Sequence, residues 1–294
     1  MIIDPRKSLG LLVPAVVVIT ILSFLVNEIC DLDIWWHLSI GRDIMANLSI
    51  PAIDKFTVAG FGQHYHDSHW LFQLLSAWAD GLFGLYGVQA CMIMCWMTTF
   101  FFVWKSARSY TDDGTVAILV FLMALTSVER FLPRPEIISF LAIAIFCYML
   151  QTGKYVSIAH LSVFFFLQVV WANSHGLFVI GPFLVTCYFL RDVFYKFSGR
   201  EHESGKTALL LIFVLAATFV VPWGADGWKY SLLIFSETSA GSPGLFRSIG
   251  ELSPVLAKQA DQALRSGSFA SWWSPRSQLW SFRSLKENST WQRH

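Results

Sequence analysis

Carboxylates and a histidine follow directly after a long apolar run near the N-terminus. Asp31, Asp33 and His37 fall in the string DLDIWWH. Two aspartates at this spacing can hold a divalent cation through their oxygens, or one of them can act as a general base. Trp35 and Trp36 suit a membrane interface, where tryptophan is enriched. A solvated loop with interfacial tryptophans explains the same string, and both interpretations stay open.

A second stretch, QHYHDSHW, carries three histidines and an aspartate within six residues. Histidine is the commonest metal ligand, and a carboxylate often completes or orients such a site. His66, Asp67 and His69 are therefore candidate metal ligands, together with Asp31 and Asp33. Neighbouring residues of one loop cannot all reach a single ion, so a solvated histidine-rich loop is the alternative.

A third group, ERFLPRPE, lies between two apolar runs at residues 129–136. The prolines on either side of Arg134 restrict the backbone and block a helix. An arginine held rigidly at a membrane surface suits the binding of a phosphate, with Arg130 as a second cation. Glu136 begins the next apolar run and needs a partner at that depth. Pairing of Arg134 with Glu136, or with lipid headgroups, is the alternative.

A fourth string, WANSHG, forms a polar turn between two apolar runs at residues 171–176. Polar groups are costly at that depth unless they are used. His175 is therefore a candidate substrate contact. A hydrogen-bonded helix connection explains the turn equally well.

The elements that must position these groups are predicted to be membrane-spanning helices. Of the 294 residues, 55% are hydrophobic and only 14% are charged. A soluble domain is usually about 25% charged, so this chain needs lipid to cover its apolar surface. The net charge of +1 argues against nucleic acid as a partner.

About seven apolar runs approach the roughly 20 residues that a helix needs to cross a bilayer. We therefore expect an all-α bundle with spans at Leu9–Ile29, Val88–Trp104, Thr115–Val128, Ile137–Gln151, Ser157–Trp171, Leu177–Leu190 and Thr207–Trp223. The run Trp70–Tyr86 contains polar residues and glycines, and we expect an interfacial or partly buried helix there.

The distribution of lysine and arginine predicts the orientation of the bundle. With seven spans, the short basic loops all fall on one side, which the positive-inside rule assigns to the cytoplasm together with the N-terminus. The opposite side receives the large first loop, residues 30–87, and both polar turns. The polar motifs are therefore expected together on the extracytoplasmic face.

The composition changes near residue 237, which divides the chain into two expected domains. Residues 1–236 form the membrane module, and residues 237–294 are rich in Ser, Gly, Arg, Gln and Trp without periodicity. Low hydrophobic order predicts a poorly structured tail. A truncated or frameshifted C-terminus is the second interpretation.

Five strings occur in order over roughly residues 10–255: DLDIWWHLSIGRDI, IPAIDKFT, HDSHWLFQLL, RPEIISF and WANSHGLFVIGP. Together they resemble bacterial multi-pass membrane proteins of the GT-C glycosyltransferase superfamily, in particular relatives of the protein mannosyltransferases. The resemblance implies a GT-C-like bundle in the bacterial inner membrane. It also implies transfer of a sugar from a lipid-phosphate-linked donor to an acceptor that the sequence does not name.

The resemblance further implies a catalytic acidic residue in the loop after the first span, here Asp33 or Asp31. Some members of the superfamily bind a divalent metal near this loop and others need none, so a metal cofactor stays open. The residues expected to contact substrate are Trp36, His37, Arg130, Arg134, Glu136 and His175.

Two other classes of function remain. Enzymes of this superfamily usually have more spans and often a soluble C-terminal domain, so a non-catalytic remnant or an assembly partner is one alternative. A multi-pass transporter is the other, although transporters usually place ionisable groups near the bilayer midplane. In this sequence such groups gather at one surface.

Overall fold

The computed structural model describes residues 5–58, 60–153, 157–199 and 204–238 of the chain. Within these ranges every regular element is a helix, and an isolated bridge between Ile53 and His64 is the one strand-like pairing. Internal contacts divide the chain into two units, residues 1–231 and 232–294. The expected tail, 237–294, lies almost wholly outside the described residues.

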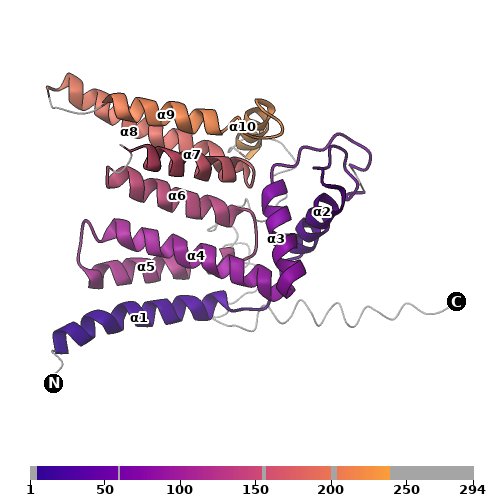
Figure 1. Ribbon diagram of the computed structural model, residues 1–294. Coiled ribbons are helices and arrows are strands. Elements are labelled where there is room, and N and C mark those ends of the chain that lie inside the picture. The colour runs from indigo at the N-terminus through magenta and orange to yellow at the C-terminus, as the bar shows by residue number, and fades with distance from the viewer. Residues whose placement is uncertain (1–4, 59, 154–156, 200–203, 239–294) are drawn as a thin grey trace, which may run out of the picture. The chain divides into compact units, whose positions relative to one another are not determined.

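Apolar helices lie side by side in the first unit (Figure 1). They are α1 (Pro5–Leu25), α4 (Leu85–Ala107), α5 (Asp113–Ser127), α6 (Glu136–Gln151), α7 (Ile158–Ala172), α8 (Ile180–Phe197) and α9 (Ser204–Ala217). Each expected span overlaps one of these helices, although several ends differ by four or more residues, and the all-α prediction is confirmed for the described part of the chain.

Two of the described helices are long and apolar enough to cross a membrane. One is α4, and the other is the continuous helix Gly176–Phe197, which joins the short 3-10 helix η2 (Gly176–Val179) to α8. The helices α6, α7 and α9 are apolar but shorter. Their crossing of a bilayer, and that of α1 and α5, stays a prediction.

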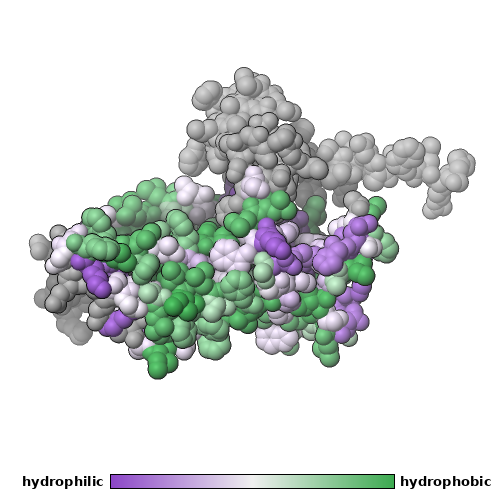
Figure 2. Space-filling view, turned by 90° about the horizontal axis from the view of Figure 1, so that it is seen from above, coloured by the Kyte–Doolittle hydropathy of each residue, from purple (hydrophilic) through white to green (hydrophobic). Residues whose placement is uncertain are grey.

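Packing among these helices buries some aromatic side chains and leaves other large apolar side chains exposed on the surface. Trp96 of α4 stacks against Phe100 and meets the edge of Phe131, while Phe146 of α6 packs against Phe164 of α7. Large apolar side chains are nevertheless exposed on α4, α5, α7 and α8, among them Phe101, Leu119, Phe166 and Phe183. Hydrophobic residues accordingly cover much of the stacked helices in Figure 2, and hydrophilic ones gather toward the ends.

The basic connections and the polar motifs lie at opposite ends of the helices (Figure 1). One end carries the connections α4–α5, α6–α7 and α8–α9, with Lys105, Arg108, Lys196 and Lys206 near them. Two further basic residues of this group, Lys154 and Arg200, are outside the described residues. The other end carries the connections α5–α6 and α7–α8 and two more helices, α2 (Asp33–Asn47) and α3 (Trp70–Phe83).

The first loop contains a helix that was not expected. Helix α2 begins within the DLDIWWH string, which had been interpreted as loop. Its buried residues Ile34, Leu38, Gly41 and Ile44 recur at helical spacing, so one apolar face packs on α3. The tryptophans and charges beside that face hide the periodicity in the sequence.

Helix α3 agrees with the expectation of a partly buried helix. Phe72, Gln73 and Ala77 are buried, whereas Leu75 and Trp78 on its other face are exposed. The buried face meets α2 and α4, and so α3 connects the polar end to the apolar bundle.

Helices α2 and α3 approach each other closely at Gly41. A Cβ atom at this position would lie 2.1 Å from the backbone oxygen of Gln73 and 2.7 Å from the Cβ of Ala77. Because the first of these is a backbone atom, it cannot rotate away as a side chain would. Glycine is therefore required for this crossing.

We predict that Gly41→Ala lowers the free energy of unfolding by about 1–3 kcal/mol, the usual cost of overpacking. The matched control is Gly81→Ala in α3, where a new Cβ meets nothing within 4 Å. Because alanine favours a helix, that change should be neutral or stabilise by about 0.5–1 kcal/mol. Unfolding of both purified variants measures the difference, and equal stability of the two would contradict the close crossing.

Candidate polar site at one end of the helices

An arginine between two prolines joins two distant connections. Arg134 Nε donates to Asp31 Oδ2 at 2.7 Å, and Arg134 Nη2 donates to Asp31 Oδ1 at 3.0 Å. The same Nη2 lies 3.1 Å from Asp33 Oδ2. Two parallel bonds from a guanidinium to a carboxylate form the strongest kind of protein ion pair. The start of α2 is thus tied to the connection between α5 and α6.

The two aspartates on this arginine differ in exposure. The Asp31 side chain is 4% exposed and that of Asp33 is 58% exposed. Burial alone would raise the pKa of Asp31, but hydrogen bonds from Arg134 and the Asp33 amide, with the charge of Arg134, lower it overall. Asp31 is therefore an ionised part of the scaffold, and Asp33 is the carboxylate that an incoming molecule can reach.

The second arginine of this connection has a different partner. Arg130 Nη1 lies 3.4 Å from Glu136 Oε1, and the Arg130 side chain is 44% exposed. The expected alternative was a pair between Arg134 and Glu136, but Arg134 turns to the aspartates and Glu136 meets Arg130 instead. An exposed pair at this distance contributes little stability, so Arg130 is available to another anion at small cost.

Three histidines from three segments form a row beside the ion pair. The ring centroids of His37 and His69 are 6.1 Å apart, and those of His69 and His175 are 5.7 Å apart. Burial lowers the pKa of His37 to about 4 and that of both His69 and His175 to about 3. All three imidazoles are therefore neutral near pH 7. Asp31 and Arg134 lie close enough to His37 to act on its charge, so the row continues into the ion pair.

Residues that the sequence did not single out hold this row in place. Ser139 Oγ lies 2.7 Å from His175 Nδ1 and accepts a hydrogen bond from Trp171 Nε1, also at 2.7 Å. Gln73 Nε2 lies 3.5 Å from His37 Nδ1. Gln73 and Ser139 are polar residues inside apolar runs, which is the signal that could have found them.

The turn before η2 forms the expected hydrogen-bonded helix connection. Asn173 accepts a hydrogen bond from Trp70 Nε1 at 2.9 Å and donates one to the Val220 oxygen at 2.8 Å. This side chain is a hydrogen-bonded connector between α3 and the segment after α9. His175, two residues later, belongs to the histidine row.

The histidine-rich stretch divides between two environments. Asp67 is completely buried, and its Oδ1 accepts a hydrogen bond from the His69 amide at 3.0 Å. Burial raises the pKa of Asp67 to about 6. His66 points elsewhere, because its ring stacks on Tyr230 at 4.8 Å and tilts against Trp223 at 4.7 Å.

This division separates the expected metal ligands. Asp31 and Asp33 face Arg134, and His66 faces the aromatic rings of Trp223 and Tyr230. Among the residues that the structure describes, no three His, Cys, Asp or Glu side chains are placed to hold a metal ion together. The five expected ligands therefore do not form a common metal site in the described part of the chain.

An apolar pocket of about 230 Å³ lies between α3, α4 and α6, beside the polar cluster. Its wall includes Phe72, whose ring meets the His37 ring edge-on, and Pro133, which precedes Arg134. Another pocket, of about 450 Å³, is lined by Trp70, Asn173 and apolar residues of α7 and of the segment after α9.

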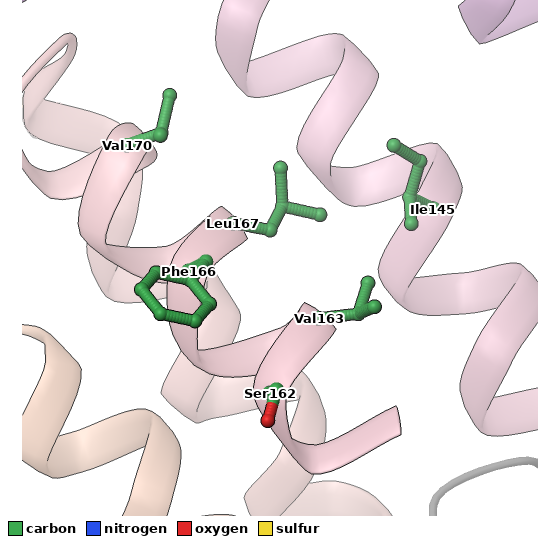
Figure 3. A pocket seen from close by; sticks show the side chains of 6 residues that line it. All are labelled: Ile145, Ser162, Val163, Phe166, Leu167 and Val170. Carbon is green, nitrogen blue, oxygen red and sulfur yellow. The ribbon is translucent and has the colours of Figure 1, made fainter. Parts of the chain in front are cut away.

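A third hollow lies away from the polar residues. It is a groove of about 400 Å³ between α6 and α7, lined by Ile145, Ser162, Val163, Phe166, Leu167 and Val170. Figure 3 shows Val163 and Leu167 of α7 pointing toward Ile145 of α6. With one hydroxyl and five apolar side chains, the groove offers no group for chemistry.

The described fold and site define an all-helical protein with candidate membrane spans and an arginine–carboxylate–histidine cluster at one end. No family model, curated protein or solved structure matches the chain.

The three histidines of the row, of which His37 is buried and His69 and His175 are partly buried, predict that stability falls in acid. In the unfolded chain the three histidines have a pKa near 6.5, so they bind protons between pH 6.5 and 4 while the folded state does not. Asp67 acts in the opposite direction between about pH 4 and 6, because its folded pKa is raised. The three histidines together outweigh Asp67, so the folded state should lose stability as the pH falls below 6.5.

Thermal unfolding of the purified protein between pH 4 and 7 measures this loss. His175→Gln should reduce it by roughly a third, since it removes one of three histidines of the row. A flat profile in the unchanged protein would contradict the burial of the row.

Proposed function

We propose that the protein is a multi-pass membrane glycosyltransferase that moves a sugar from a lipid-phosphate carrier to an acceptor. The observation that supports this best is the exposed Asp33 on the Arg134 ion pair, beside an apolar pocket at the end of an apolar helical bundle. A lipid-linked sugar has an apolar tail, an anionic phosphate and a polar sugar. The cluster offers a complementary surface for each part.

The proposed orientation places the polar cluster outside the cytoplasm of a bacterial cell. In this proposal α1, α4, α5, α6, α7, α8 and α9 all cross the inner membrane. The basic ends of α4 and α8 then lie in the cytoplasm, in agreement with the positive-inside rule. The aspartates, arginines and histidines lie at the outer surface, where helices α2 and α3 cover the bundle.

The donor is proposed to bind along the pocket between α3, α4 and α6. The lining of this pocket is almost wholly apolar, which suits a hydrocarbon chain. The pocket reaches Pro133, so a phosphate at the head of the chain comes close to Arg134 and Arg130. Arg130 is the more exposed of the two and has only a weak partner, so it is the arginine that the phosphate can recruit.

Asp33 is proposed to act as the general base. The acceptor hydroxyl attacks the anomeric carbon, its proton passes to the Asp33 carboxylate, and the bond between that carbon and the phosphate oxygen breaks. The lipid phosphate leaves with the electron pair, and the nearby arginines stabilise its charge. Asp31 is a positioning residue in this scheme, because its two bonds to Arg134 hold the guanidinium that Asp33 also contacts.

The test is Asp33→Asn, measured with membrane vesicles and radiolabelled polyprenyl-phosphate hexoses. Loss of a general base costs about 10²- to 10⁴-fold, so release of label from the lipid should fall by at least about 100-fold. The control, Asp43→Asn in the same helix, removes a carboxylate that pairs with Lys55 at 3.4 Å. That variant should release label within about twofold of the unchanged protein.

The outcome that removes the proposal is an Asp33→Asn variant that releases label as fast as the control. Gel filtration and the helical circular dichroism of both purified variants show whether each is folded. Equal folding with unequal rates assigns the loss to the carboxylate itself.

A further inference from the structure

Three buried polar atoms beside the ion pair have no hydrogen-bond partner. They are Trp36 Nε1, Asp67 Oδ2 and Gln73 Oε1. Asp67 and Gln73 are completely buried. A buried donor or acceptor without a partner costs about 1–3 kcal/mol, so native structures keep few of them. Three in one neighbourhood indicate a ligand that completes them.

These atoms belong to residues that surround one aromatic side chain. The Tyr65 ring meets the Trp36 ring edge-on, with centroids 6.4 Å apart. The Gln73 side chain already hydrogen-bonds both Tyr65 and Asp67, so only the atoms Asp67 Oδ2 and Gln73 Oε1 of this pair lack a partner, and burial raises the pKa of Tyr65 far above its usual range. The Trp36 and Tyr65 residues are only partly buried, so part of each is accessible from outside, whereas the Asp67 and Gln73 residues beside them are completely buried.

The chemistry of the three atoms specifies the kind of ligand. One is an N–H donor and two are oxygen acceptors. A ligand that satisfies them must offer an acceptor and two donors close together, which neighbouring hydroxyl groups do. The aromatic rings offer apolar surface to the C–H groups of the same molecule.

The position of this group connects it to the proposed reaction. Asp33 and Trp36 are three residues apart in α2, so they are neighbours on one side of the helix, with Cβ atoms about 5–6 Å apart. This separation is close to the width of one hexose ring. A sugar seated against Trp36 can therefore present its neighbouring atoms to Asp33.

We propose that Trp36, Tyr65, Asp67 and Gln73 form a subsite that binds the hydroxyl groups of a hexose. The subsite rests on the proposed glycosyltransferase function, which it deepens by naming the residues that select the sugar. A site built to hydrogen-bond hydroxyl groups rejects molecules that lack them, because its buried polar atoms are then left unpaired.

The test is ligand-observed NMR on the purified full-length protein in nanodiscs. The probes are the methyl glycosides of glucose, galactose and mannose, with tetrahydropyran as a ring of similar size without hydroxyl groups. At least one glycoside should bind saturably, and tetrahydropyran should not. Binding of no glycoside, or equal binding of tetrahydropyran, overturns the subsite and leaves a cluster that only water completes.

Two variants test the named atoms. Trp36→Phe removes the N–H and keeps an aromatic ring, and one lost hydrogen bond of about 1.4 kcal/mol should weaken glycoside binding about tenfold. Trp35→Phe, at the neighbouring tryptophan that is 50% exposed, is the matched control and should bind within about twofold. Asp67→Asn replaces the unpaired acceptor by a donor and should also weaken binding about tenfold. Equal affinity of the Trp35 and Trp36 variants overturns the assignment.

The same preparations separate this subsite from the proposed reaction. Glycoside binding that depends on Trp36, in a protein that never transfers sugar, keeps the subsite and removes the glycosyltransferase. Sugar transfer that survives Trp36→Phe together with unchanged glycoside binding removes the subsite and keeps the enzyme.

Discussion

The polar end of this protein depends on the ion pair between Arg134 and Asp31. Both side chains are largely withdrawn from solvent, at 16% and 4% exposure. A charge in such a place is tolerated only when it is paired and hydrogen-bonded, and removal of one partner leaves the other uncompensated. The pair therefore fixes the start of α2 against the connection before α6. The positions of the neighbouring polar side chains depend on this attachment.

The remaining polar contacts extend outward from this pair. His37 lies next to it and leads through His69 to His175, whose ring is fixed by Ser139 and Trp171. The contact between His69 and His175 joins segments more than 100 residues apart in the chain, whereas the helices beneath are held together mainly by apolar packing. Apolar packing is tolerant of small shifts, but hydrogen bonds are directional. The precision of the site therefore comes from its polar network.

The sequence predicted the helices of the bundle well, because each is a continuous apolar run between polar connections. It also predicted that four polar strings lie at one end, which the contacts of Arg134 and His69 bear out. The sequence does not predict helix α2 because Trp35 and Trp36, which lie beside its apolar face, hide the helical spacing of that face. The candidate metal ligands were predicted from residue types alone. The spacing of residues in the sequence does not show that the His66 side chain turns toward Tyr230, away from the other candidates. The hydrogen bonds that join Ser139 to His175 and Trp171 became recognisable only in the folded chain.

A double-mutant cycle on Asp31 and Arg134 tests the central claim most directly. The free energy of unfolding is measured in bicelles for Asp31→Asn, Arg134→Gln and the double variant. Each single change should cost about 3–5 kcal/mol, and the double change should cost at least about 1 kcal/mol less than their sum, because the second change removes a charge that has already lost its buried partner. Costs that add to within about 0.5 kcal/mol would show that the two side chains do not depend on each other, and the account of the site would fail.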